Sequence, residues 1–409
     1  MALTYKESLL VKASVPVLRE HGETVSRLCY SRLLAANPEF NNILSKTNQA
    51  NGRQPRAFTA VILAFASHIS HTSELVPRLE RMCNKHCSLG VKPEHYAVIG
   101  KHLLEAFALV LGSQWTPALN AAWAKAYSML SKMLMTREGQ MYGQFGAWQG
   151  WRNFRLDRKV IEADGIFSLH LTPCDGGLLP NFRPGQYVSV RVPVPSTGNY
   201  ASRQYSLSEC SGDSYYRITV RRVQGTKGEA AGVVSGLLDE RQTGDILQLT
   251  HPTGEFYFDN HPSMSPLVLI SAGIGVTPLI SILHSALALN PDRPVSWIHC
   301  SPRKAPFEDH LRQLAEAHPN LRTKFFRSKA RQPDLENKPP QYEMGRLELA
   351  SIGLEKLHLD HGGAEYYICG PELLTEDVAG FLSIQGVDPA RVKHELFTTG
   401  DLEFKAYNV

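Results

Sequence analysis

The chain has 409 residues, of which 43 are basic and 39 acidic, and 43% of its residues are apolar. This length predicts two or three domains, and the composition is that of a typical globular protein. The even charge balance and the lack of a basic–aromatic stripe argue against a nucleic-acid partner. Seven cysteines without a CxxC pair, and an N-terminus without an apolar signal core, predict a cytoplasmic protein with no disulfide framework or zinc site.

Residues 1–146 are expected to form an all-α domain. Apolar residues recur at every third or fourth position, as in VILAFASHI and HLLEAFALVL. Gly90 and Pro93 predict that one helix ends near Leu89 and that the next begins near Pro93. Alternation of the β type is scarce in this part of the chain.

After GQFGAWQGW, at 143–151, apolar residues alternate with a period of two. The expected strands are FRLDRKVIEA, IFSLHLTP, QYVSVRVPV, YRITVRRV and DILQLT, and turn residues such as DGG and TGN separate them. Several short strands at this spacing predict an antiparallel β-barrel, which we place at 152–260.

From 262 to 409 strands and helices alternate, which predicts a doubly wound parallel sheet of the α/β class. The segment 263–290 has no Asp, Glu, Lys or Arg and is long enough to span a membrane. Glycines and a proline interrupt it, so a buried strand, a glycine turn and a buried helix are the better interpretation. The polar segment RSKARQPDLENKPPQYEMG is expected to be a surface loop.

The motifs FRPGQYVSV (182–190) and RQYSLS (203–208) resemble the ferredoxin–NADP reductase family. The resemblance implies that this segment binds FAD: an arginine fork suits the pyrophosphate, and a tyrosine ring suits the isoalloxazine. It also implies that the turn GVVS receives the pyrophosphate at a helix start. By itself, RQYS would also fit an ordinary strand end. The implied FAD-binding residues are Tyr187, Arg203, Gln204, Tyr205, Ser206, Gly232 and Ser235.

The motif SAGIGVTP (271–278) follows an expected strand and opens an expected helix, which is the setting of a nucleotide-binding glycine loop. Together with CGP at 369–371 it resembles the reductase family, which implies hydride transfer from NADH or NADPH to FAD. The family closes with Glu-x-Phe-Gly-Pro, whereas Thr398 and Thr399 replace the last two residues here. The implied nucleotide-site residues are Gly273, Ile274, Gly275, Val276, Thr277, Pro278, Cys369, Gly370, Pro371, Glu395 and Phe397.

The stretch NKHCSLGVKPEHY (84–96), with YSRLLAANPEF and TNQANGRQPRA, closely resembles flavohaemoglobins, and the resemblance covers essentially the whole chain. It implies a haem b whose iron is bound by His86. Tyr96 and Glu138 match the pair that hydrogen-bonds this imidazole and raises its basicity. Tyr30 matches the tyrosine that donates to bound O2, and Gln54 matches the distal glutamine. A lone histidine is more often structural, and an exposed helix charge is the alternative interpretation of Glu138.

Two residues of the expected distal pocket depart from the family pattern. The family usually has phenylalanine at the position of Leu44 and leucine at the position of Phe58. The two changes run in opposite directions, so a volume-conserving exchange across the pocket is one interpretation. Such an exchange alters the shape of the pocket without removing a ligand or a proton donor.

The resemblance as a whole implies a nitric oxide dioxygenase that converts NO and O2 to nitrate with electrons from NADH or NADPH. Two alternatives stay open at this point: a reductase of ferric ions, quinones or hydroperoxides, and a sensor of O2 or NO. The complete reductase part argues against a sensor, because binding alone needs no hydride donor. We expect a monomer with no membrane span, and leave open an association with lipid.

Overall fold

The computed structural model describes residues 3–146, 148–212, 214–225, 230–259, 261, 263–329 and 341–397. Two compact units are distinguished, and each is described by itself. The first contains Met1–Trp151 and the segment Arg191–Arg203, and the second contains Arg152–Val190 and Gln204–Phe397. Most of the expected surface loop, and the altered positions Thr398 and Thr399, lie outside the described residues.

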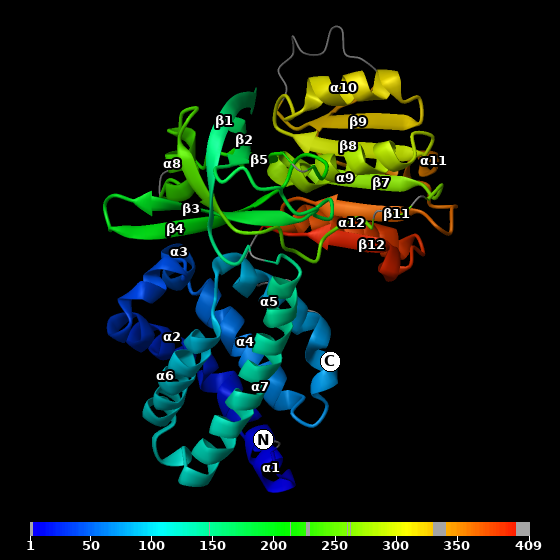
Figure 1. Ribbon diagram of the computed structural model, residues 1–409. Helices are drawn as coiled ribbons and strands as arrows, with labels where there is room; N and C mark the ends of the chain where they lie inside the picture. Colours follow the sequence, from blue (N-terminus) through cyan, green and yellow to red (C-terminus); the bar gives the residue numbers. More distant parts are fainter. Residues whose placement is uncertain are drawn as a thin grey trace. The chain divides into compact units, whose positions relative to one another are not determined.

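The N-terminal part is all-α, as predicted (Figure 1). Gly90 has a φ of 71°, a left-handed conformation that glycine adopts easily and that commonly ends a helix. Helix α5 therefore ends at Leu89, and α6 begins at Pro93. This places His86 in the last turn of α5. The helices are α1 (Tyr5–Ala13), α2 (Val15–Ala36), η1 (Pro38–Asn42), α3 (Lys46–Ala50), α4 (Arg53–Ser67), η2 (Thr72–Leu75), α5 (Val76–Leu89), α6 (Pro93–Leu111), η3 (Gly112–Gln114) and α7 (Pro117–Gly143).

Helix α6 supplies much of the core of this unit. Together with the following turn, at Pro93–Gln114, it is the one helix among the described residues that is long and apolar enough to cross a membrane. Its Leu103, Ala106 and Phe107 are buried in the same core cluster as Phe65 and Trp123. A place in the core of the helical part therefore accounts for its apolar composition.

The β-type segment forms one six-stranded antiparallel sheet in the order β4-β3-β6-β1-β2-β5, and this confirms the predicted antiparallel architecture. A bridge between Leu207, just after β4, and Ile218 in β5 joins the two outer strands, as closure into a barrel requires. Its elements are β1 (Arg152–Ala163), β2 (Ile166–Pro173), β3 (Tyr187–Val194), β4 (Asn199–Ser206), β5 (Tyr216–Arg221), α8 (Val233–Asp239) and β6 (Ile246–Leu249).

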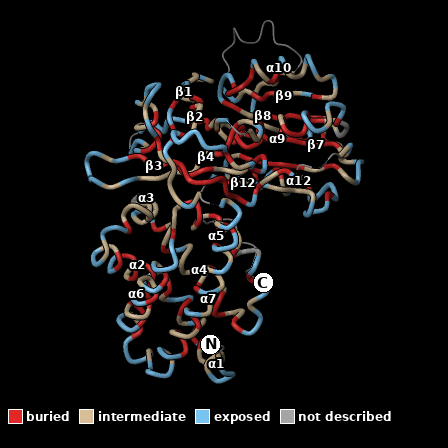
Figure 2. Tube along the Cα trace, viewed as in Figure 1, coloured by how far each residue is buried: buried red, intermediate tan, exposed pale blue. Residues whose placement is uncertain are grey.

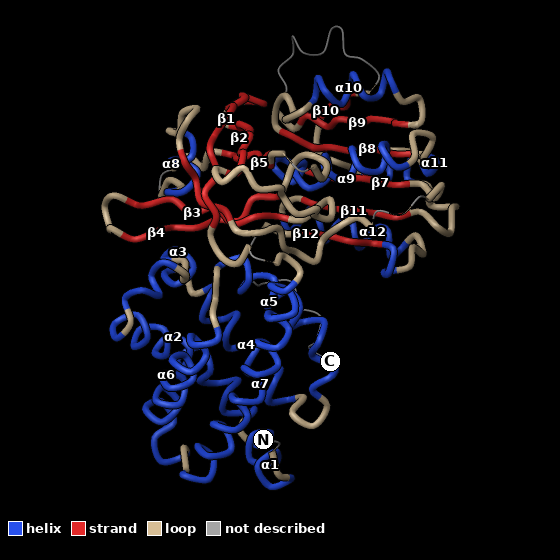
Figure 3. Tube along the Cα trace, in the orientation of Figure 1, coloured by secondary structure: helices blue, strands red, loops and turns tan. Residues whose placement is uncertain are grey.

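The C-terminal part is a parallel sheet in the order β10-β9-β8-β7-β11-β12, as predicted (Figure 3). Helices α9 and α10 contribute to the core on one face, and α12 to the core on the other. The middle strands are therefore buried along their length (Figure 2), and the uncharged segment 263–290 is a strand, a turn and a buried helix. The elements are β7 (Leu267–Ala272), η4 (Gly273–Gly275), α9 (Val276–Leu289), β8 (Val295–Ser301), α10 (Glu308–Ala317), β9 (Leu321–Arg327), β10 (Tyr342–Met344), η6 (Leu349–Ser351), α11 (Leu354–Leu357), β11 (Glu365–Cys369), α12 (Glu372–Ile384), η7 (Pro389–Arg391) and β12 (Val392–Glu395).

Candidate functional site

His86, Tyr96 and Glu138 come together from three helices, α5, α6 and α7. The Nδ1 atom of His86 lies 2.8 Å from the phenol oxygen of Tyr96 and 2.8 Å from Oε1 of Glu138. The Tyr96 hydroxyl donates to the same Oε1 atom at 2.5 Å. Glu138 is 3% exposed, so it is not the exposed helix charge that the sequence left open. A buried carboxylate needs donors, and these two side chains supply them.

This arrangement fixes which nitrogen of His86 carries a proton. A carboxylate can only accept a hydrogen bond, so Nδ1 of His86 must donate to Glu138. Burial raises the pKa of Tyr96, and the charge of Glu138 raises it further. The phenol therefore stays protonated and donates a hydrogen bond to the carboxylate. The Nε2 atom of His86 is then left with a free lone pair, and the described residues give it no hydrogen-bond partner. A neutral imidazole with an exposed lone pair is a metal ligand.

Tyr30 lies on α2, whereas Gln54 and Phe58 lie one turn apart on α4. The rings of Tyr30 and Phe58 are 5.5 Å apart between centroids. Burial raises the pKa of Tyr30, and a hydrogen bond with the Gln54 side chain acts in the opposite direction, so Tyr30 stays a neutral donor. The Oε1 atom of Gln54 is buried and has no partner among the described residues. A buried polar atom without a partner is costly, and it fits a pocket built for a polar ligand.

Leu44 and Phe58, the two departures from the family pattern, pack against one small cluster formed by Tyr30, Leu33 and Phe40. Leu44 also lines a cavity of ≈ 470 Å³ between α2, η1, α3 and α4. Because Leu44 and Phe58 share this cluster, a change of volume at one position alters the space open to the other.

We expect the two departures to be coupled. Phe58→Leu alone should lower the free energy of unfolding by about 1 kcal/mol or more, because it leaves a void in the cluster. Leu44→Phe in the same chain should recover part of this loss. Urea unfolding of the two single variants and the double variant measures the coupling, and additivity within about 0.3 kcal/mol would contradict a shared space.

The residues expected to bind FAD are spread over β3, β4 and the start of α8. Tyr187 opens β3, with its ring against Gly254, where an added Cβ would lie 3.0 Å from a ring carbon. Arg203, Gln204, Tyr205 and Ser206 are the last four residues of β4. Nη1 of Arg203 donates to its neighbour's carbonyl oxygen, and the Gln204 amide donates to Ser189 Oγ at 2.8 Å.

The turn from Gly232 to Ser235 is tightly built. The Ser235 hydroxyl donates to the carbonyl oxygen of Gly232 at 3.1 Å and accepts from the backbone N–H of Val223 at 3.2 Å. A Cβ on Gly232 would lie 2.6 Å from this hydroxyl oxygen and 2.8 Å from the side chain of Val223. Glycine is therefore required at the start of α8, and Ser235 holds the turn in shape.

The expected nucleotide residues meet at the carboxyl edge of the parallel sheet. Residues Gly273 to Gly275 follow β7, and α9 begins directly after them with Val276, Thr277 and Pro278. Cys369 ends the neighbouring strand β11, and Glu395 ends β12 beside it in register. Burial raises the pKa of the Cys369 thiol, and the charge of Glu395 raises it further, so the thiol stays neutral. Gly370 and Pro371 lead into α12. The side chain of Phe397, two residues after β12, is 50% exposed.

Known proteins resemble this chain in sequence and in fold. Residues 27–134 match the globin family, residues 158–258 the oxidoreductase FAD-binding domain, and residues 269–380 the oxidoreductase NAD-binding domain. The flavohemoprotein of Bordetella parapertussis is 41% identical over 400 residues, which cover 96% of this chain and 97% of that protein. The flavohemoprotein of Bacillus subtilis is 35% identical over 95% of this chain and 96% of its own length.

The chain belongs to the flavohemoprotein family. Among solved structures, the flavohemoglobin of Malassezia yamatoensis with bound FAD and heme superposes with a TM-score of 0.84 at 25% identity, covering 97% of this chain and 100% of that one. The FAD/NAD-binding domain of a nitric oxide dioxygenase from Vibrio cholerae is 29% identical, with a TM-score of 0.53 over 60% of this chain and 98% of that one. This member of the family is an oxidoreductase whose cofactors are haem, FAD and a pyridine nucleotide.

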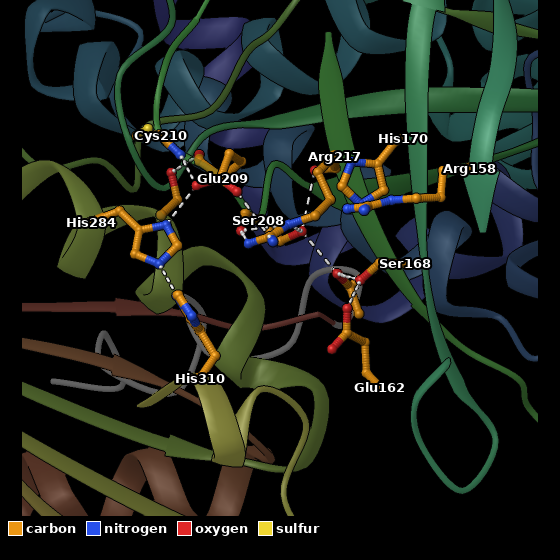
Figure 4. A network of polar contacts seen from close by, with 12 residues as sticks. Arg158, Glu162, Ser168, His170, Ser208, Glu209, Cys210, Arg217, His284 and His310 are labelled. Carbon is orange, nitrogen blue, oxygen red and sulfur yellow. Dashed lines mark hydrogen bonds and ion pairs between the residues drawn. The ribbon is translucent and has the colours of Figure 1, made fainter. Parts of the chain in front are cut away.

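A polar network beside the flavin segment was not found by sequence reasoning (Figure 4). Glu209 follows RQYSLS directly, and its carboxylate accepts from Nδ1 of His284 at 2.6 Å and pairs with Arg217 at 3.1 Å. Nε2 of His284 meets Nε2 of His310 at 2.7 Å. Burial raises the pKa of Glu209, but the hydrogen bond from His284 and the charge of Arg217 outweigh it and hold this pKa at about 2. The network ties the segment after β4 to α9, the helix that follows the expected nucleotide loop. Its members are far apart in the sequence and form no motif.

Proposed function

We propose that this flavohemoprotein removes nitric oxide, with one NAD(P)H supplying two electrons to convert two NO and two O2 molecules to two nitrate ions. The observation that carries the proposal is the His86–Tyr96–Glu138 arrangement, since a carboxylate that accepts a hydrogen bond from the outer nitrogen of a ligating imidazole makes it a better electron donor to a metal. A protein that only stores or senses O2 needs neither this basic ligand nor a reductase part. The Vibrio cholerae protein that shares the reductase fold is named a nitric oxide dioxygenase.

Haem and FAD, when bound, supply the oxygen chemistry and the conversion of a hydride into single electrons. The chain's own part is to bind and orient these groups and to place protons. His86 would hold the iron through Nε2, while Glu138 keeps the proton on Nδ1. Tyr30 would donate a hydrogen bond to O2 in the pocket, and Gln54 would add a second polar contact there. Residues Arg203 to Ser206, Tyr187 and the turn at 232–235 would hold FAD.

In the reductase part, the loop from Gly273 to Pro278 and the residues after β11 would receive the nicotinamide nucleotide. Gly275 allows the loop to pass close to the backbone at Cys369 and Gly370. The neutral thiol of Cys369 would offer an apolar contact to the nicotinamide, and Glu395 and Phe397 would lie at the same edge. We place the three domains at 1–146, 152–260 and 262–409.

We also propose that the protein acts in a reducing cytoplasm. All seven cysteines are free, three of them deeply buried in the helical part, as expected where disulfides do not form. A monomeric state and an association with lipid stay predictions.

The test of the proposed function is NO consumption by the purified protein in the presence of O2 and NADH or NADPH. We expect NO loss that requires all three substrates and produces nitrate in equal amount. Reduction of ferricyanide or quinone without NO consumption would instead favour a reductase of other acceptors. Binding of O2 and NO without turnover of nucleotide would favour a sensor.

Tyr30→Phe should accelerate O2 dissociation about five- to thirtyfold, because the loss of a hydrogen bond costs about 1–2 kcal/mol. NO consumption at low O2 should fall with it. Stopped-flow measurement of O2 dissociation on the haem-loaded protein tests the expectation, with Tyr5→Phe, at a residue that is 80% exposed, as the matched control. An unchanged rate would mean that the Tyr30 hydroxyl does not reach O2.

A further inference from the structure

The order of the parallel strands sets where a dinucleotide is read. If β7 is numbered as the first strand and the edge strand β10 is left out, the strands β9-β8-β7-β11-β12 have the order 3-2-1-4-5. In this topology the dinucleotide lies across the carboxyl ends of the strands, with its pyrophosphate at the glycine loop after the first strand. The residues at the end of the second strand read the adenosine ribose: an acidic residue accepts from the 2′-hydroxyl of NAD, and a nearby arginine accommodates the 2′-phosphate of NADP.

The second strand here is β8, and basic residues follow it. The strand ends at Ser301, and Pro302, Arg303 and Lys304 come next, all three exposed. The first acidic residue after β8 is Glu308, which is 4% exposed. It accepts from the backbone N–H of Ala305 at 2.9 Å, from Arg327 at 2.7 Å and from Tyr342 at 2.7 Å. Its carboxylate is therefore fully used inside the protein and is not available to a ribose hydroxyl.

A second group of cations reaches the same place from β9 and from the turn after β10. Arg327 ends β9 opposite Ser301 in register, and the backbone N–H of Lys329 donates to the carbonyl oxygen of Pro302 at 3.1 Å. The guanidinium of Arg327 lies 4.6 Å from the ring centroid of Tyr342. Burial raises the pKa of the Cys300 thiol, whereas a hydrogen bond with the Leu347 backbone and the charge of Arg346 lower it, so Arg346 adds positive potential near the end of β8.

The exposed cations are held only by surface ion pairs. Arg303 pairs with Asp164 at 3.2 Å, and their side chains are 70% and 82% exposed. Lys304 pairs with Asp309 at 2.5 Å, with side chains 53% and 54% exposed. Exposed pairs of this kind contribute little, so both cations can turn to a phosphate group at small cost. A phosphate monoester offers nearly two negative charges and several acceptor oxygens, and it outcompetes a single solvated carboxylate.

We infer that the chain prefers NADPH to NADH, and that Arg303 and Lys304 bind the 2′-phosphate near the end of β9, where Arg327 lies. The inference rests on the proposed function, because it assumes that the glycine loop after β7 receives a nicotinamide dinucleotide. It assigns the choice between the two nucleotides to the loop Ser301–Lys304, which no motif in the sequence pointed out. The cations at 303 and 304 act on the 2′ position alone, so they should alter the preference between nucleotides rather than the hydride transfer.

Binding of nucleotide fragments tests the inference without turnover. Isothermal titration of the full-length protein should show that adenosine 2′,5′-bisphosphate binds at least about tenfold more tightly than AMP, the gain expected from one or two charge-assisted hydrogen bonds. In the double variant Arg303→Ala, Lys304→Ala the ratio of the two affinities should fall toward one. Arg322→Ala removes an exposed cation at the opposite, amino end of β9 and should leave the ratio as it is.

Ferricyanide reduction gives the matching kinetic measurement. The kcat/KM for NADPH should exceed that for NADH, and the double variant should lose this advantage mainly through a higher KM for NADPH. Equal affinities for the two fragments, or a double variant that keeps the preference, would overturn the inference. A protein that prefers NADPH in this assay but does not consume NO would retain the inference and contradict the proposed function, so the two failures can be told apart.

Discussion

His86→Ala should yield a protein that is purified without haem but still reduces ferricyanide with NAD(P)H. The His86 imidazole has a free lone pair at Nε2, because Glu138 and Tyr96 hold its other nitrogen. Without it, Glu138 and Tyr96 remain as a buried pair with no group to orient. The residues expected to bind flavin and nucleotide lie in other elements of the chain, so the reductase activity should persist. The haem Soret absorbance relative to the flavin absorbance measures the result.

The matched control for this variant is His71→Ala, because His71 is an exposed histidine of the same helical part. It should keep its haem. Free imidazole added to the His86→Ala protein should restore part of the haem binding if the cavity left by the side chain is intact, and this separates loss of a ligand from loss of the fold. Full haem content in His86→Ala without imidazole would show that another residue binds the iron.

The fold could be predicted from the sequence wherever the pattern was local. The helix boundary at Gly90 and Pro93 follows from the backbone conformations of these two residues, and the strand, turn and helix between 267 and 289 follow from apolar runs around glycines. The short strands β10 and β12 escaped prediction. They have only 3 and 4 residues at the sheet edges, so register with a neighbouring strand, rather than their own sequence, makes them strands.

The candidate site divides in the same way. The motifs around Arg203, Gly273 and Cys369 are each a continuous run of residues, so they could be recognised in the sequence. The structure puts the two expected nucleotide motifs, after β7 and after β11, at one edge of the parallel sheet. The burial of Glu138 could not be decided from the sequence, because α7 carries charged residues on several faces and only packing against α5 and α6 selects one of them. The network of Glu209 and His284 joins residues 75 positions apart, and no local pattern marks it.

Gly275→Ala should reduce NAD(P)H-dependent ferricyanide reduction by about a hundredfold, the loss that a displacement of about 1 Å at a reacting centre can cause. A methyl group on Gly275 would lie 2.1 Å from the carbonyl oxygen of Cys369 and 3.0 Å from the backbone nitrogen of Gly370. Cys369 is paired with Ser271 in the β7–β11 ladder, so its carbonyl oxygen cannot move aside as a flexible side chain would. The loop before α9 must shift instead, and with it the nucleotide.

The backbone conformation of Gly275 itself, with a φ of −61°, would accept alanine, so the predicted defect comes from the contact with β11 alone. This makes Gly380→Ala a suitable control: that glycine lies in α12 of the same sheet domain, and an added Cβ there meets nothing within 4 Å. It should keep full activity and gain a little stability, since alanine favours a helix interior. The haem spectrum of Gly275→Ala should stay normal, because the residues expected to bind haem lie in the helical part. If Gly275→Ala reduces ferricyanide as fast as the Gly380→Ala control, the loop after β7 does not position the nucleotide, and the assignment of the carboxyl edge of the sheet as its binding site fails.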